Sequence, residues 1–181
     1  MREYSDFIDR ILLQPDLLGK LCPSEALRWD LPKRVQEAED ALISGGKPIA
    51  DVAMFGLVRG LLFFAVDAVD AAHRIFQDEK SDLGSYLHGM VHRREPDFDN
   101  ARYWFRRAGR LPFFQKLHGE AVEHSAVVGR QSTWDPYLFT GECEQARHGA
   151  IEKVPELVRL QRAEFEVIFD YCWKKSVAGL S

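Results

Sequence analysis

The sequence lacks the features of a nucleic-acid-binding or membrane-inserted chain. Lys and Arg number 24 against 28 Asp and Glu, a net charge of -4, so the clustered cations that contact phosphates are missing. The most apolar run, residues 60–66, is far too short to cross a bilayer, and the start MREYSDFIDR is charged rather than apolar. We therefore expect neither nucleic acid nor a membrane as a partner.

Cysteine is also scarce. Cys22, Cys143 and Cys172 are odd in number and far apart, without the paired spacing of a zinc ribbon or a redox motif. Reduced thiols in the cytoplasm fit this pattern best, so we predict a cytoplasmic protein. We interpret the three thiols as small buried apolar groups rather than as nucleophiles.

Signals for β-structure are missing as well, because no window alternates apolar and polar residues and no hairpin dipeptide joins two such runs. The 181 residues, 46% hydrophobic and 29% charged, suit one folded domain. Helical spacing and Gly or Pro boundaries predict a single all-α domain over 1–181, a bundle of seven or eight helices. The predicted helices cover residues 5–13, 33–43, 49–77, 83–95, 100–108, 112–124, 136–148 and 155–175.

The segment 49–77 is predicted to be a long, buried central helix, since its first half has hydrophobic residues on every face. Its second half differs, because four charged residues fall on one stripe with His73 beside them. Such charges must pair with one another or line a cavity. The stripe consists of Arg59, Asp67, Asp70 and Arg74.

The most informative pattern is His88, His92 and Glu95, which lie at i, i+4 and i+7. This spacing places them within about 60° of one helix face. Two imidazoles and a carboxylate form the ligand set of many catalytic zinc and non-haem iron sites. The pattern predicts a divalent transition metal there, zinc, iron, nickel or manganese. The zinc-protease signature does not fit, because Gly89 stands where its general base would be.

Two dibasic pairs flank the turn after this helix. Their guanidinium groups either form ion pairs with Asp67 and Asp70 or hold an anionic ligand. Tyr103 stands one helical turn before Arg107, so both can line one pocket. His118 and His124 differ in helix phase, so at most one of them supplies a third imidazole. The dibasic pairs are Arg93 with Arg94 and Arg106 with Arg107.

The run YLHGMVHRREPDFDNARYWFRRAG resembles the signature of an uncharacterised family of small bacterial and fungal helical proteins, HGxxHRxExDxxNAxYWxRRxG, and WDPYLFTGECE resembles it further on. Pro96 and Leu111 depart from the pattern, which has Gly and His there. The resemblance implies a location for the site but brings no activity with it. The matching residues are His88, Gly89, His92, Arg93, Glu95, Asp97, Asn100, Ala101, Tyr103, Trp104, Arg106, Arg107, Gly109, Trp134, Asp135, Pro136, Cys143 and Glu144.

The first functional hypothesis is a small-molecule site, metal-assisted, in a cleft between the His88 helix, the long helix and the Trp134 loop. A carboxylate or phosphate compound would fit it. A non-catalytic binding module is the first alternative. The second is a closed polar network whose surface mediates homo-oligomer or partner contacts. The expected catalytic residues are His92, Glu95 and Asp70, and the expected ligand contacts are Arg107, Tyr103, Asn100, Arg93 and Trp134.

Overall fold

The structure, a computed structural model, describes residues 4–179. In this range it has ten α-helices, two short 3-10 helices and no strand, apart from an isolated bridge between Ile49 and Val177. The all-α prediction is confirmed, and the helix count exceeds the predicted seven or eight. The helices are α1 Asp6–Leu12, α2 Leu31–Glu37, α3 Asp40–Ser44, α4 Val52–Ala65, α5 Val69–Phe76, α6 Asp82–Arg94, α7 Phe98–Ala108, α8 Phe114–Ala121, α9 Pro136–Arg147 and α10 Val154–Ser176, with 3-10 turns at Val128–Arg130 and Ile151–Lys153.

The extra helices arise because two predicted segments are divided. Residues 33–43 belong to α2 and α3, which are separated by extended backbone at Ala38 and Glu39. The predicted central helix over residues 49–77 is divided into α4 and α5. The sequence patterns therefore identified these segments as helical but missed the break within each.

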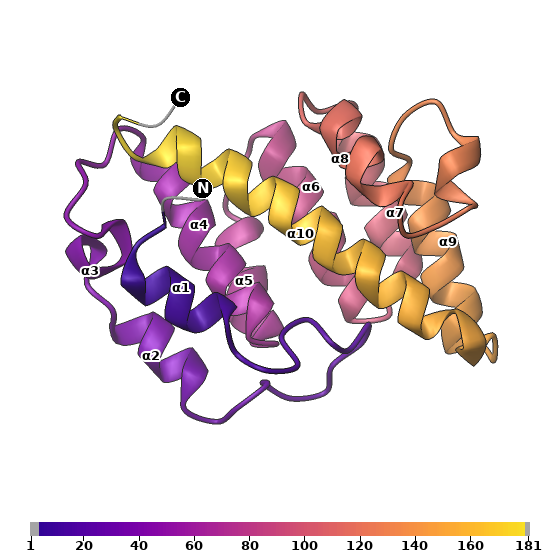
Figure 1. Cartoon of the computed structure of the whole chain (residues 1–181), viewed down its shortest axis with the longest axis horizontal. Coiled ribbons are helices and arrows are strands. Elements are labelled where there is room, and N and C mark those ends of the chain that lie inside the picture. Colours follow the sequence, from indigo (N-terminus) through magenta and orange to yellow (C-terminus); the bar gives the residue numbers. More distant parts are fainter. Residues whose placement is uncertain (1–3, 180–181) are drawn as a thin grey trace.

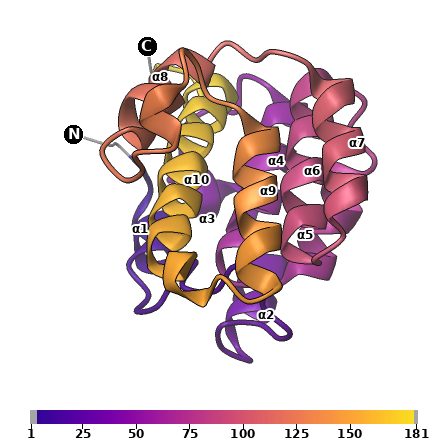
Figure 2. The same cartoon turned by 90° about the vertical axis from the view of Figure 1, so that its right-hand side faces the viewer.

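The break between α4 and α5 is held by Asp67 and Arg94. Asp67 has a φ of 62°, a left-handed conformation that costs energy for any residue with a Cβ. Arg94 of α6 forms an ion pair with Asp67, and its Nη1 donates to the carbonyl of Phe64 at 2.7 Å. These charge-assisted bonds offset the strain. The chain therefore changes direction here, and α5 packs against α6 (Figure 2).

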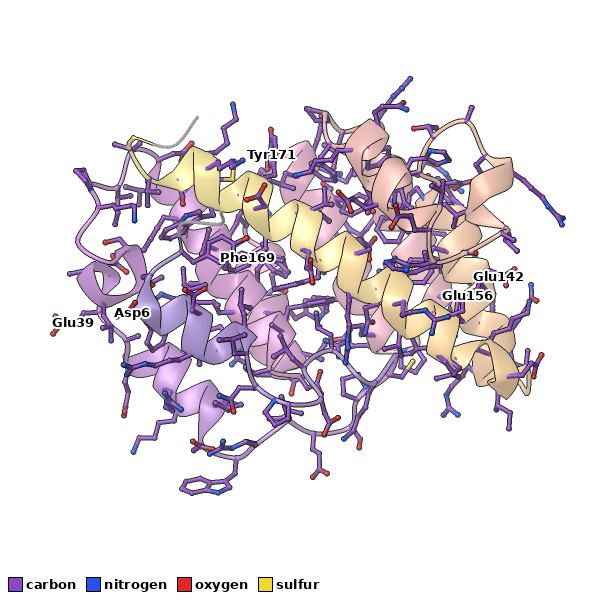
Figure 3. All side chains as sticks on the ribbon, in the orientation of Figure 1. Asp6, Glu39, Glu142, Glu156, Phe169 and Tyr171 are labelled. Carbon is purple, nitrogen blue, oxygen red and sulfur yellow. The ribbon has the colours of Figure 1, made fainter. Side chains whose placement is uncertain are left out.

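The core is centred on α4 and α10. The longest helix, α10, runs along the length of the molecule and packs on α4, α8 and α9 (Figure 1). Side chains crowd between α10 and the helices behind it, Phe169 among them, which is completely buried (Figure 3). Because α4 is buried on nearly every side, it is the predicted central helix, although it covers only part of the predicted span 49–77. No helix in residues 4–179 is both long and apolar enough to span a bilayer.

Candidate metal centre

Three histidines from two helices bring their imidazole rings together. His88 and His92 stand one turn apart on α6, and His73 comes from α5. The Nε2 atoms of His73 and His88 are 2.8 Å apart, and those of His88 and His92 are 3.1 Å apart. One ring nitrogen from each residue lies within 4.8 Å of the other two. The predicted pairing of His88 with His92 on one helix face is therefore present, and it is joined by a third imidazole.

The local sequence explains why α6 can present these rings. Ser81 caps the helix by accepting a hydrogen bond from the Gly84 amide at 3.0 Å, and the helix ends before Pro96 as predicted. Gly89 lets α7 approach, because a Cβ there would lie 2.8 Å from the ring of Phe105. The one residue that rules out the protease motif therefore has a packing role between α6 and α7.

Glu95 holds the histidines from outside the cluster. Its Oε1 lies 2.8 Å from His73 Nδ1, and its Oε2 lies 3.3 Å from His92 Nδ1. A carboxylate on the outer nitrogen is the usual partner of a metal-binding histidine, because it fixes the Nδ1-protonated tautomer and leaves the Nε2 lone pair free. Of the predicted ligand set, His88 and His92 belong to the converging group together with His73, whereas Glu95 lies on the outer nitrogens of His73 and His92.

The three inner nitrogens are incompatible with a full set of hydrogen bonds among themselves. With protons on the Nδ1 atoms of His73 and His92, both unprotonated Nε2 atoms lie within hydrogen-bonding distance of His88 Nε2, which carries at most one proton. A cation between the rings would accept all three lone pairs. The N···N distances of 2.8 and 3.1 Å are somewhat shorter than the roughly 3.3 Å between two nitrogens bound to one tetrahedral zinc ion, and the three ring nitrogens lie within 4.8 Å of one another.

The environment keeps the buried imidazoles neutral. His88 and His92 are 5% and 7% exposed. Burial, with the neighbouring His92 and His73, lowers the pKa of His88 to about 4. Burial and His73 also lower the pKa of His92, although Glu95 and Asp97 partly oppose this. Neutral imidazole is the form that binds metals, so these rings need not lose a proton near pH 7.

Residues of α7 border the cluster. Asn100 Nδ2 is 3.2 Å from His92 Nε2, and the Trp104 ring stacks on His88 with a centroid separation of 4.1 Å. The Arg107 guanidinium lies 5.7 Å from the centre of the Trp104 ring. Tyr103 is half exposed next to them. Among the predicted ligand contacts, Asn100 thus adjoins the histidines, while Tyr103 and Arg107 lie further out.

Two other predicted ligand contacts have partners in the core instead. Arg93 forms a buried ion pair with Glu164 of α10. Glu164 also accepts a hydrogen bond of 2.7 Å from the Tyr86 hydroxyl, which accepts one of 2.7 Å from Trp134 Nε1. Trp134 is 2% exposed, so its loop does not form a wall of the predicted cleft. Arg93 and Trp134 therefore serve the packing of α6 against α10.

The predicted stripe on the central helix does not persist either, because the break at residues 66–68 divides it. Arg59 pairs with Asp40, and Asp67 pairs with Arg94. Asp70 is exposed, and within residues 4–179 no hydrogen bond or ion pair joins it to the histidines. The structure therefore gives no support to Asp70 as a catalytic residue.

The cluster reaches solvent at its margin, where the side chains of His73 and Glu95 are 25% and 27% exposed. Four hollows on the described surface are lined by other residues. His118 and His124, the expected sources of a third imidazole, lie elsewhere; His118 Nε2 is 3.3 Å from the carbonyl of Val128. The arrangement is thus a largely buried cluster carried by α5 and α6 and bordered by α7.

His73 is the functional residue that sequence reasoning missed. The sequence places His73 beside the charged stripe, but a continuous helix over residues 49–77 gives no reason to expect its side chain to face His88. Its position depends on the break at Asp67, for which the sequence offers no glycine or proline.

Comparison with known proteins adds no function. No protein-family model, curated protein or solved structure matches this chain. The candidate site therefore has to be interpreted from its own geometry.

Proposed function

We propose that this chain binds one divalent transition metal ion through His73, His88 and His92, and that the bound ion acts on a small molecule. The observation that carries the proposal is the convergence of the three Nε2 atoms, with Glu95 on the outer nitrogens of two of the rings. Structural zinc sites are closed by four protein ligands, whereas catalytic sites use three and leave a position for water or substrate. Three histidines at a partly exposed margin match the second kind.

Zinc is the ion we favour, since three imidazoles and a water molecule complete a tetrahedral zinc site. Iron(II), nickel and manganese also accept imidazole ligands and remain alternatives. A bound ion of this kind would supply Lewis acidity and a water molecule of lowered pKa. In this proposal His92 is a ligand, and Glu95 positions His73 and His92 rather than binding the ion.

One observation favours a second candidate, a closed polar network without a metal. The neighbouring Arg93 and Arg94 are fully buried and paired with acids, so α6 already carries charges with a purely structural role. If the histidines also have a purely structural role, their mutual contacts serve only to fix the packing of α5 on α6.

Metal analysis of protein purified without a histidine tag separates the two candidates. We expect one ion per chain and a rise in melting temperature when zinc is added to metal-free protein. His88→Ala should abolish both effects. The matched control is His118→Ala, which removes an imidazole outside the cluster and should keep both. Absence of metal, with no thermal shift on adding zinc, iron(II), nickel or manganese, would establish the closed network instead.

A further inference from the structure

Trp29 and Leu13 are the two most exposed large hydrophobic side chains in residues 4–179, at 90% and 81%. Their segments are joined, because Nη1 of Arg28 donates a hydrogen bond of 3.1 Å to the side chain of Gln14. Arg28 also donates two bonds of 3.1 Å to the carboxylate of Asp30. The residues on both sides of Trp29 are thus tied together, so a fixed turn holds the indole in water.

A hollow of about 370 Å³ lies next to this turn, between α1 and α10. Gln14, which accepts the hydrogen bond from Arg28, belongs to its lining, so Trp29 and the hollow are neighbours. Figure 1 shows α1, α2 and the loop between them in the lower part of the molecule. Pockets that take a small molecule have volumes of about 300–1,000 Å³, so an indole fits. The apolar lining at this end consists of Leu12, Leu13 and Leu17.

The hollow and the Trp29 turn carry opposite charges. Of the charged side chains that line the hollow, three are acids and one is a cation. They are Asp9, Asp16, Glu166 and Arg162. Lys33 and Arg34 follow Trp29 at the start of α2, 71% and 42% exposed, and their ion pairs with nearby acids are long, at 3.7 and 4.0 Å. Opposite charges on two surfaces favour their association and set its orientation.

A projecting indole and a hollow side by side make this surface complementary to itself. A two-fold axis between them places each Trp29 against the hollow of the other copy and closes the assembly at a dimer. The same rotation brings Lys33 and Arg34 toward the acids around that hollow. A different protein would have to present both a matching projection and a matching hollow, whereas a second copy has both by symmetry.

From this arrangement we infer that two copies of the chain form a symmetric dimer, in which Trp29 of each enters the hollow of the other. A buried indole NH needs an acceptor, and the carboxylates of Asp9 and Asp16 have no ion pair within residues 4–179. An indole buries about 150–250 Å² and covers a similar area of the lining, so two such contacts with Leu13 approach about 1,000 Å². This area is typical of a weak interface, so we expect a micromolar dissociation constant. The inference goes beyond the metal centre and does not depend on it.

Sedimentation velocity of the full-length chain over a series of concentrations tests the dimer. Trp29→Ala should weaken association at least about 30-fold, because truncation of a central tryptophan removes the main contact from both halves of the interface. Ile151→Ala is the matched control. It truncates another exposed hydrophobic side chain, 73% exposed, in the 3-10 turn before α10, and should leave the association unchanged.

A second variant tests whether the indole enters the hollow. Leu13→Arg puts a cationic side chain at the edge of the hollow, where it repels the incoming Lys33 and Arg34, and should also give a monomer. A mixture of Trp29→Ala and Leu13→Arg should nevertheless form heterodimers of intermediate affinity. The reason is that the second chain keeps its indole and the first keeps its hollow, which restores one of the two contacts. Circular dichroism of each variant checks that the fold is intact.

Three results would overturn the inference. One is a monomer at every concentration, and another is a dimer that Trp29→Ala does not weaken. The third is a mixture without heterodimers, because the indole and the hollow would then not meet. Sedimentation of a monomer with phosphatidylcholine vesicles, lost in Trp29→Ala, would assign the indole to a lipid surface instead.

Discussion

Two groups of polar side chains on α6 have opposite characters. Arg93 and Arg94 point into the core and pair with Glu164 and Asp67, so each charge has a counter-charge. His88 and His92 point toward α5 and α7, and their inner nitrogens face one another with too few protons to satisfy them. A buried charge that faces its counter-charge indicates a structural role. A buried polar group whose lone pairs converge on a point indicates a missing partner.

Removing one member of the paired group should have the largest effect on stability. Glu164→Ala leaves Arg93 buried without a counter-charge, and we expect the free energy of unfolding to fall by about 3–5 kcal/mol. Chemical denaturation measures the loss. Glu156→Ala, at a partly exposed position on the first turn of the same helix, should cost less than about 1 kcal/mol. Equal stability of the two variants would show that the Arg93 pair is not structural.

A smaller effect on stability but a clear one on metal affinity is expected at Glu95. Glu95→Gln removes the carboxylate from the outer nitrogens of His73 and His92, which should weaken zinc binding about 10- to 100-fold. Competition with a chromophoric chelator measures the affinity. Asp70→Asn, which removes the other acid predicted from sequence, should leave it unchanged. Loss of affinity in Asp70→Asn and not in Glu95→Gln would contradict the assignment.

The smallest effect is the pH dependence of the metal-free protein. The pKa of His88 is lowered from 6.5 to about 4, so the unfolded chain binds a proton there more readily than the folded one. This contribution to stability is present above about pH 6.5 and is lost as the pH falls toward about 4. Urea unfolding at about pH 7 and about pH 5 should show the decrease. His88→Gln should make it smaller, whereas His148→Gln, at an exposed position, should not.

Local sequence predicted those parts of the site that lie within one helix. The predicted span 83–95 differs by one residue at each end from α6. Helical spacing also placed His88 and His92 on one face. These features follow from interactions between residues a few positions apart, which is why a single sequence contains them.

Contacts between residues that are far apart along the chain could not be predicted from the sequence. Arg93 finds Glu164 at a separation of 71 residues, and a periodic pattern gives the direction of a side chain but not its partner. His73 was missed because the helix break at Asp67 lacks a glycine or proline signal. The carboxylate of Glu95 is predicted near the histidines, and it lies beside the outer nitrogens of His73 and His92, a position that depends on the third ring.

The strained turn at Asp67 has a consequence for how the site is assembled. The third imidazole faces the other two only because the backbone turns there, and Arg94, two residues after His92, holds that turn. The helix that carries two of the clustered histidines thereby also sets the direction of the segment that carries the third. The complete cluster therefore forms only in a correctly folded chain. Where Arg94 does not pair with Asp67, the imidazoles of His88 and His92 are in place, but that of His73 is not.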